Sequence, residues 1–157
     1  MFEHAFTEFE RVVHAMVAEL LPDGFDVSAD APDTFEGLQA HYAATGRVLV
    51  WNGASGQTIF STPESNFAFR AWHDFTHLKC HTNFTLVGEA QTCDAQIADM
   101  LDIIGRWTWI LAPILQAEIV GQALYEAKHG KFPVNQRAFT VAYLQDKEAA
   151  LHGDYDE

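Results

Sequence analysis

Apolar residues recur at helical spacing through most of the chain. Between residues 2 and 20 they fall at about every third or fourth position, and the charged side chains lie mostly at other positions. This pattern predicts an amphipathic helix with one face in a core. The same criterion predicts helices at about 34–45, 62–81, 86–104 and 135–151.

Residues that typically start and stop helices set the expected boundaries. Asp33 can cap the second predicted helix and Gly46 can end it. Ser61 or Thr62 can cap the third. The agreement between caps and periodicity favours separate helices of ordinary length.

Residues 106–129 are apolar on almost every side, which predicts a central, buried helix. Pro113 is expected either to kink this helix or to mark a boundary between two pieces. Gly130 then ends it.

Two short runs lack the helical period and are rich in residues that favour strands. They are RVLVW at 47–51 and QTIF at 57–60, separated by the turn-forming sequence NGASG. They predict one β-hairpin at about 47–60. An isolated hairpin is marginally stable, so it should pack on the helices or pair with another subunit.

The expected fold is therefore mainly α, with about six helices in a compact bundle and one inserted hairpin. A chain of 157 residues can bury an ordinary core, and we expect one domain over 1–152. The acidic residues 153–157 are expected to form a disordered tail.

The net charge of −13 narrows the range of partners. Nucleic-acid phosphates and anionic membranes are disfavoured, because binding to them needs clustered Lys and Arg. The longest apolar run is too short to span a bilayer, and the N-terminus lacks the features of a signal peptide. Cys80 and Cys93 are expected to be reduced thiols. We expect a cytoplasmic protein that binds neither nucleic acid nor membrane.

The helix over 62–81 carries an unusual polar face. An ordinary solvated face would carry Lys and Glu, whereas five residues within an arc of roughly 100° are Arg70, His73, Asp74, His77 and His81. His73 and His77 are four residues apart, which places two imidazoles on one face at a spacing suited to metal ligands.

The next two predicted helices direct carboxylates towards the core. Glu89 projects into the apolar stripe of the first, beside Cys93, and Glu118 shares an apolar face of the second with Gln122 and Tyr125. A buried carboxylate must be paired, protonated or metal-bound, because burying an isolated charge is costly. Three helices with inward ionisable groups are typical of a site inside a helical bundle.

Three interpretations of this pattern stay open. The first is a metal site that uses some of His73, His77, Glu89 and Glu118, with N and O ligands that suit Zn, Mn, Fe or Ni. The second is an internal polar network, in which Glu89 or Glu118 forms a salt bridge with Arg70 and the histidines donate hydrogen bonds. The third is a metal-free site for a small polar ligand.

The sequence His73-Asp74 followed by His77 resembles the HD pair of the HD-domain metal-dependent phosphohydrolases. That family has an all-helical fold and uses an upstream His, the HD pair and a downstream Asp around one or two metals. The resemblance implies that His41 is the upstream His. The residues available as the downstream Asp are Asp94, Asp99 and Asp102.

The run HDFTH also resembles the HExxH motif of zinc peptidases, with Asp74 in the place of the Glu. In that resemblance Glu89 or Glu118 is the third ligand, and the acidic residue acts on a metal-bound water as general base.

The main hypothesis is a metal-dependent hydrolase that acts on a phosphorylated small molecule such as a nucleotide. The alternative is a non-enzymatic helical protein whose buried polar network fixes its packing or an oligomer interface. Homo-oligomers could form through the hairpin or through aromatic helix faces. The predicted roles are metal ligation by His73, His77, Glu118 and Glu89, catalysis by Asp74, Glu89 and Arg70, and substrate binding by Arg70, Gln122 and Tyr125.

Overall fold

The computed structural model describes residues 2–157 and confirms a mainly α fold. Helices account for 66% of the residues, and the strands form one small two-stranded sheet. Here η1 is a 3₁₀ helix and η2 is a π-helical turn. In chain order the elements are α1 (Glu3–Leu20), β1 (Asp26–Ser28), α2 (Phe35–Thr45), β2 (Leu49–Trp51), α3 (Pro63–Cys80), α4 (Leu86–Ile103), η1 (Arg106–Leu111), α5 (Ala112–Gln116), η2 (Ala117–Gly121), α6 (Gln122–His129), α7 (Gln136–Gln145) and α8 (Lys147–Ala150).

Most helix boundaries follow the capping residues. The Thr62 hydroxyl accepts a hydrogen bond from the Ser65 N–H and starts α3, one of the two caps expected there. Thr34, rather than Asp33, caps α2 in the same way. Gly46 ends α2 with φ of 69°, a backbone conformation that glycine adopts at little cost.

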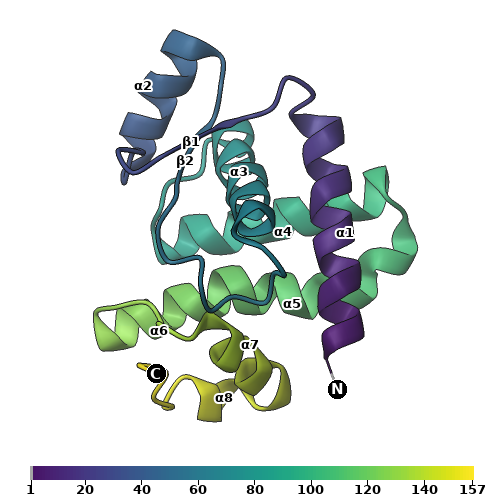
Figure 1. Ribbon diagram of the computed structural model, residues 1–157, viewed down its shortest axis with the longest axis vertical. Coiled ribbons are helices and arrows are strands. Elements are labelled where there is room, and N and C mark those ends of the chain that lie inside the picture. The colour runs from purple at the N-terminus through teal and green to yellow at the C-terminus, as the bar shows by residue number, and fades with distance from the viewer. Residues whose placement is uncertain (1) are drawn as a thin grey trace.

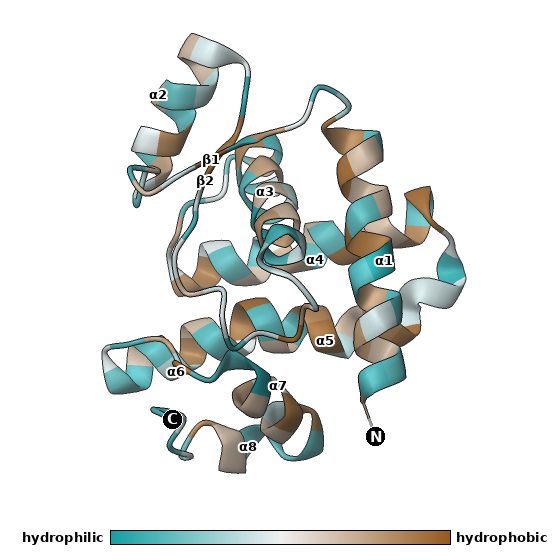
Figure 2. Ribbon diagram, in the orientation of Figure 1, coloured by the Kyte–Doolittle hydropathy of each residue, from teal (hydrophilic) through white to brown (hydrophobic). Residues whose placement is uncertain are grey.

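The main core forms where α1 packs against α3, with α4 and α5 closing it. In Figure 1, α2 lies at one end of the molecule and α7 with α8 at the other. The long helices carry hydrophobic and hydrophilic residues in alternating bands, as expected for helices with one buried face (Figure 2). Side chains from four helices meet in this core, among them Phe9, Met16, Trp72, Met100 and Leu115.

The predicted β-hairpin is wrong in its pairing. β2 pairs in parallel with β1, with Val50 opposite Val27, and α2 forms the crossover between them. Residues 57–60 form no strand. Ile59 and Phe60 are nevertheless buried in the core, so their apolar character reflects packing rather than a sheet. β1 escaped prediction because three residues flanked by turn-forming residues carry little periodic signal.

The predicted helix over 106–129 is divided into four pieces. Pro113 stands at the start of α5, so the expected boundary at this proline is confirmed. The expected burial is wrong for η1, because Trp107 and Trp109 are 48% and 67% exposed. From Ile114 to Gly121 most side chains are buried, as expected for a central helix.

The last predicted helix is divided into α7 and α8, and the acidic tail lies against α6 and α7. The tail over 153–157, which was expected to be disordered, makes defined contacts in this structure. The Tyr155 ring contacts Tyr125 and Phe139, and its carbonyl accepts a hydrogen bond from the Asn135 N–H. None of the helices in residues 2–157 combines the length and hydropathy that crossing a bilayer requires.

Candidate metal centre

The site lies between α3 and α4, which are joined by a short connection. His81 takes a left-handed backbone conformation, with φ of 54°, and ends α3. Thr85 caps the start of α4. At Gly88 a Cβ atom would lie 1.9 Å from the Asn83 carbonyl oxygen, so only glycine lets the first turn of α4 approach this connection. The next residue, Glu89, is thereby held facing α3.

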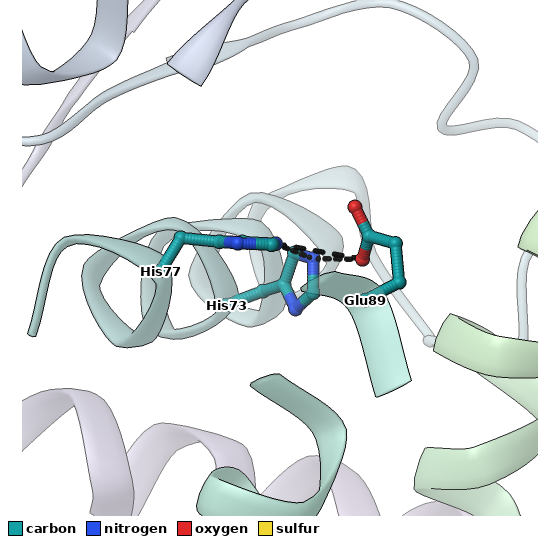
Figure 3. A group of neighbouring side chains, drawn as sticks. All are labelled: His73, His77 and Glu89. Atoms are coloured by element: carbon teal, nitrogen blue, oxygen red, sulfur yellow. Dashed lines mark hydrogen bonds and ion pairs between the residues drawn. The ribbon is translucent and has the colours of Figure 1, made fainter. Parts of the chain in front are cut away.

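Three side-chain atoms converge in this site (Figure 3). The Nε2 atoms of His73 and His77 are 3.0 Å apart. Glu89 Oε2 lies 3.0 Å from His73 Nε2 and 3.4 Å from His77 Nε2. Two histidines one turn apart on α3 and a carboxylate at the start of α4 thus form a small triangle of donor atoms.

The dimensions of this triangle fit one metal ion. With ligand distances of about 2.1 Å, neighbouring donors are separated by about 3.0 Å in an octahedral site and about 3.4 Å in a tetrahedral one. The three observed separations lie within this range. An ion could therefore contact all three atoms with little movement of the side chains.

The other ring nitrogens are held by acceptors. His73 Nδ1 lies 2.8 Å from Gln96 Oε1, and His77 Nδ1 lies 3.0 Å from the Thr82 carbonyl oxygen. A carbonyl oxygen can only accept, so each Nδ1 donates to it. When a ring is neutral, this leaves the lone pair of its Nε2 directed into the triangle. Metal-binding histidines commonly have such partners.

These three atoms need a proton or a metal ion between them. Two Nε2 lone pairs and a carboxylate oxygen at these distances repel one another unless a proton or a metal ion lies among them. Burial would raise the pKa of Glu89, but its hydrogen bonds and charge interactions with His73 and His77 lower it to about 2. The carboxylate is therefore ionised at neutral pH and ready to bind a cation.

The pKa of His73 is consistent with the same requirement. Burial alone would lower it, but the hydrogen bond and the charge of Glu89, with smaller effects from Asp74 and Gln96, raise it above the ordinary value. Without a metal ion, a proton on His73 is the cation that this arrangement favours.

The site is closed on one side and open on the other. His77 is fully buried, and the rings of Phe84 and Phe35 lie 4.9 and 6.5 Å from its ring. The side chains of His73 and Glu89 are 18% and 17% exposed. A small ion can therefore reach the triangle from the side of His73 and Glu89.

Asp74, predicted to be catalytic, is partly buried beside this cluster. Burial raises the pKa of its carboxyl to about 6, although His73, His77 and Arg70 oppose the shift and Glu89 adds to it. Asp74 has charge interactions with His73, His77 and Glu89, so its charge contributes to the electrostatic potential at the site. A carboxyl with this pKa can take up and release a proton near neutral pH.

Arg70 has a different environment from the one expected. Its guanidinium donates hydrogen bonds to the carbonyl oxygens of Trp51, Gly53 and Ala54, at 2.7, 2.6 and 3.2 Å. It also stacks 5.5 Å from the centre of the Trp51 ring. Within residues 2–157 it forms no ion pair with Glu89 or Glu118, so the salt bridges of the predicted polar network are absent. Arg70 holds the segment after β2 on α3.

The other predicted site residues lie apart from the three ligand atoms. Glu118 was predicted as a ligand, but its carboxylate accepts hydrogen bonds from Thr140 and Gln122. Gln122, predicted to bind substrate, is buried in that contact. Tyr125 was given the same role, but it packs on Phe139 and His129 in a separate cluster. Helical periodicity placed these residues inward correctly without showing which part of the interior they enter.

The residues that would extend the HD pair are not in the cluster either. Within residues 2–157 the three-ligand group contains neither His41 nor any of the three aspartates expected as partners. Asp99 instead pairs with Lys79, and Asp94 is exposed. The resemblance to the HD-domain proteins is therefore limited to His73, Asp74 and His77, the residues that suggested it.

Sequence reasoning missed the two groups that orient the imidazoles. A backbone carbonyl such as that of Thr82 leaves no trace in a sequence. Gln96 did leave one, since it lies two turns after Glu89 and so on the same face of α4. A glutamine on the face that carries a candidate ligand could have indicated this partner.

Comparison of the chain with protein-family models, with curated proteins and with solved structures finds no match. The function must therefore be argued from the site itself.

Proposed function

We propose that this protein is a metal-dependent hydrolase whose divalent ion is held by His73, His77 and Glu89. One observation carries the proposal. Two imidazole Nε2 atoms and one carboxylate oxygen converge at 3.0–3.4 Å, while both Nδ1 atoms face acceptors that keep the proton away from Nε2. This donor set supports zinc or iron most directly, with manganese and nickel also suited to N and O ligands.

The arrangement suits hydrolysis because three protein ligands leave coordination positions for water and substrate. In such a site a divalent ion lowers the pKa of a bound water towards neutrality. Asp74 is the proposed general base, since its pKa of about 6 lets it accept a proton at neutral pH. Glu89 stays ionised as a ligand.

A phosphorylated small molecule is the proposed substrate class. Arg70 places one positive charge near Asp74 and Glu118. Three of its N–H groups already donate to carbonyl oxygens, so it could assist an anion mainly through its charge.

A cytoplasmic setting is proposed on the basis of the two free cysteines. Self-association is proposed through the exposed Trp107 and Trp109.

The alternative is a structural polar network without metal, and the raised pKa of His73 favours it. A protonated His73 could supply the positive charge between His77 and Glu89 and fix the packing of α3 on α4. The two proposals differ in what occupies the triangle, so metal content separates them.

The first experiment is elemental analysis of protein purified without chelator or added metal. We expect close to one equivalent of a transition metal per chain. Less than about a tenth of an equivalent, with no rise in the unfolding temperature on adding Zn²⁺, would favour the structural network, because a ligand that binds only the folded state must stabilise it.

The second experiment removes one ligand. His77→Ala is expected to lose the metal, and His81→Asn is the matched control. The control removes an imidazole one turn further along α3, and asparagine tolerates the left-handed backbone there. Metal retained by His77→Ala would mean that the ligand set is wrong.

The third experiment tests the reaction class. Metal-loaded protein is assayed with chromogenic phosphate mono- and diesters and with a carboxylic ester. Hydrolysis of a phosphate ester that is lost in both His77→Ala and Asp74→Asn would support the proposal. Hydrolysis of the carboxylic ester alone would support a hydrolase and reject the phosphorylated substrate.

A further inference from the structure

Gln96 lies in the part of the interior where a glutamine is least expected. Its side chain is fully buried between α3 and α4. Its Oε1 accepts from His73 Nδ1, whereas its Nε2 is buried without a hydrogen-bond partner among residues 2–157. An unpaired buried donor is destabilising, because no hydrogen bond offsets the loss of its contact with water. Packing alone would therefore favour an apolar residue here.

α4 contacts the His73 ring at both nitrogens. Glu89 Oε2 lies 3.0 Å from Nε2, and Gln96 Oε1 lies 2.8 Å from Nδ1. A neutral imidazole has one N–H, so these two acceptors compete for a single proton. If the proton lay on Nε2 and were donated to Glu89, Nε2 would have no lone pair for an ion. If the proton lies on Nδ1 and is donated to Gln96, Nε2 is free to bind an ion.

His77 has a backbone acceptor besides its side-chain partners, since the hydroxyls of Thr82 and Thr92 also lie 3.1 Å from its Nδ1. Its Nδ1 faces the backbone carbonyl of Thr82 at 3.0 Å, in the fixed connection between α3 and α4. His77 Nδ1 thus has a backbone acceptor that no substitution removes, whereas the acceptor at His73 Nδ1 is a replaceable side chain.

We infer that Gln96 is a positioning residue of the metal centre, which holds the His73 proton on Nδ1 against the competing pull of Glu89. This inference rests on the proposed function, since the lone pair it preserves is the one offered to the ion. Gln96 does not itself contact the ion or the substrate.

Two substitutions separate this role from packing. Gln96→Leu keeps the size but removes the acceptor, and Gln96→Glu keeps an acceptor and cannot donate in its ionised form. Gln91→Leu is the matched control, because Gln91 is exposed on the same helix. Gln96→Leu also removes the unpaired buried amide, so it should fold at least as stably as the natural chain, as a thermal melt without metal would verify.

The first readout is Zn²⁺ affinity, measured by competition with a chromogenic chelator. We expect Gln96→Leu to weaken binding by about 10- to 100-fold, the usual effect of losing such a partner. Gln96→Glu should bind as tightly as the natural chain or more tightly, and Gln91→Leu should bind unchanged. Binding by Gln96→Leu within about twofold of the natural chain would overturn the inference.

The second readout needs no metal. ¹⁵N NMR of the metal-free protein at about pH 9, where imidazoles are neutral, reports which ring nitrogen of His73 carries the proton. We expect Nδ1 in the natural chain and in Gln96→Glu, and a shift to Nε2 in Gln96→Leu. An unchanged tautomer in Gln96→Leu, or a proton on Nε2 in Gln96→Glu, would overturn the inference. If the natural chain binds no Zn²⁺, the proposed function fails, and this readout still decides whether Gln96 controls the tautomer.

Discussion

Two carboxylates, the half-buried Glu89 and the buried Glu118, illustrate how neighbours decide what a glutamate can do. Glu89 faces two imidazoles, and these outweigh burial and lower its pKa to about 2. Glu118 faces the neutral donors Thr140 and Gln122, with Arg70 acting only through its charge, so burial prevails and raises its pKa to about 7. The sequence pattern suggested one role for both residues.

The difference is one of charge rather than of depth. Neutral hydrogen-bond donors satisfy a carboxylate without supplying the positive charge that keeps it ionised in the interior. Imidazoles can supply that charge by binding a proton, or can share a metal ion with the carboxylate. Glu89 is therefore equipped to bind a cation, whereas Glu118 is equipped to hold a proton near neutral pH.

The largest expected effect comes from making the same substitution at both positions. Glu89→Gln keeps the side-chain shape and removes the charge and one ligand oxygen. We expect Zn²⁺ affinity to fall by at least about 100-fold, more than is usual for a residue that only supports a ligand. Glu118→Gln should leave the affinity within about twofold, as measured by chelator competition. Equal losses of Zn²⁺ affinity in Glu89→Gln and Glu118→Gln would mean that Glu118 is also a metal ligand.

The next effect is on stability as a function of pH. The pKa of Glu118 in the folded protein, about 7, exceeds the ordinary value of 4.5. The folded state thus binds more protons than the unfolded state between these values, and the free energy of unfolding falls as pH rises through this window. The loss is at most about 3 kcal/mol. Glu118→Gln should remove it.

Urea unfolding at several pH values, with a chelator present, measures this contribution as the difference between Glu118→Gln and the natural chain. The advantage of the variant should grow from pH 5 to pH 8. Glu126→Gln, at an exposed position on α6, is the control and should show no such trend. A difference that does not change with pH would mean that Glu118 is ionised throughout.

The smallest expected effect concerns the hydroxyl that supports Glu118. Thr140→Val removes a hydrogen-bond donor from a fully buried site and leaves Gln122 as the remaining donor. We expect a loss of about 1–2 kcal/mol, larger at pH 8 than at pH 5 because the ionised form needs the donor more. Thr140→Ser keeps the hydroxyl and should preserve the pH dependence. Equal losses at both pH values would show that only packing changed.

The parts of the fold that the sequence predicted are those with strong local signals. The helix from Pro63 to Cys80 has a cap and a regular pattern of buried residues, and both are local. β1 has three residues, and its partner β2 lies beyond α2, so only tertiary structure pairs them. Residues 106–111 were expected to lie in a buried helix, but Trp107 and Trp109 are exposed, because hydrophobicity does not show which aromatic residues face solvent.

The sequence could predict those features of the site that depend on one helix alone. The spacing of His73 and His77 places them together on any regular helix, and Glu89 stood out on an apolar face. Whether Glu118 also meets them depends on the position of a third helix, which periodicity does not determine. Arg70 was assigned to a substrate because the carbonyl oxygens it binds are invisible in the sequence.

The attachment of α2 has a consequence for the timescale on which the site would exchange the proposed ion. Leu38 is the only buried residue of this helix, so α2 should open locally more often than α1 or α3. Its first residue, Phe35, lies against His77 and Phe84. Each opening would therefore uncover the most enclosed ligand. The rate of metal release would then follow the dynamics of a peripheral helix rather than the strength of the metal bonds alone.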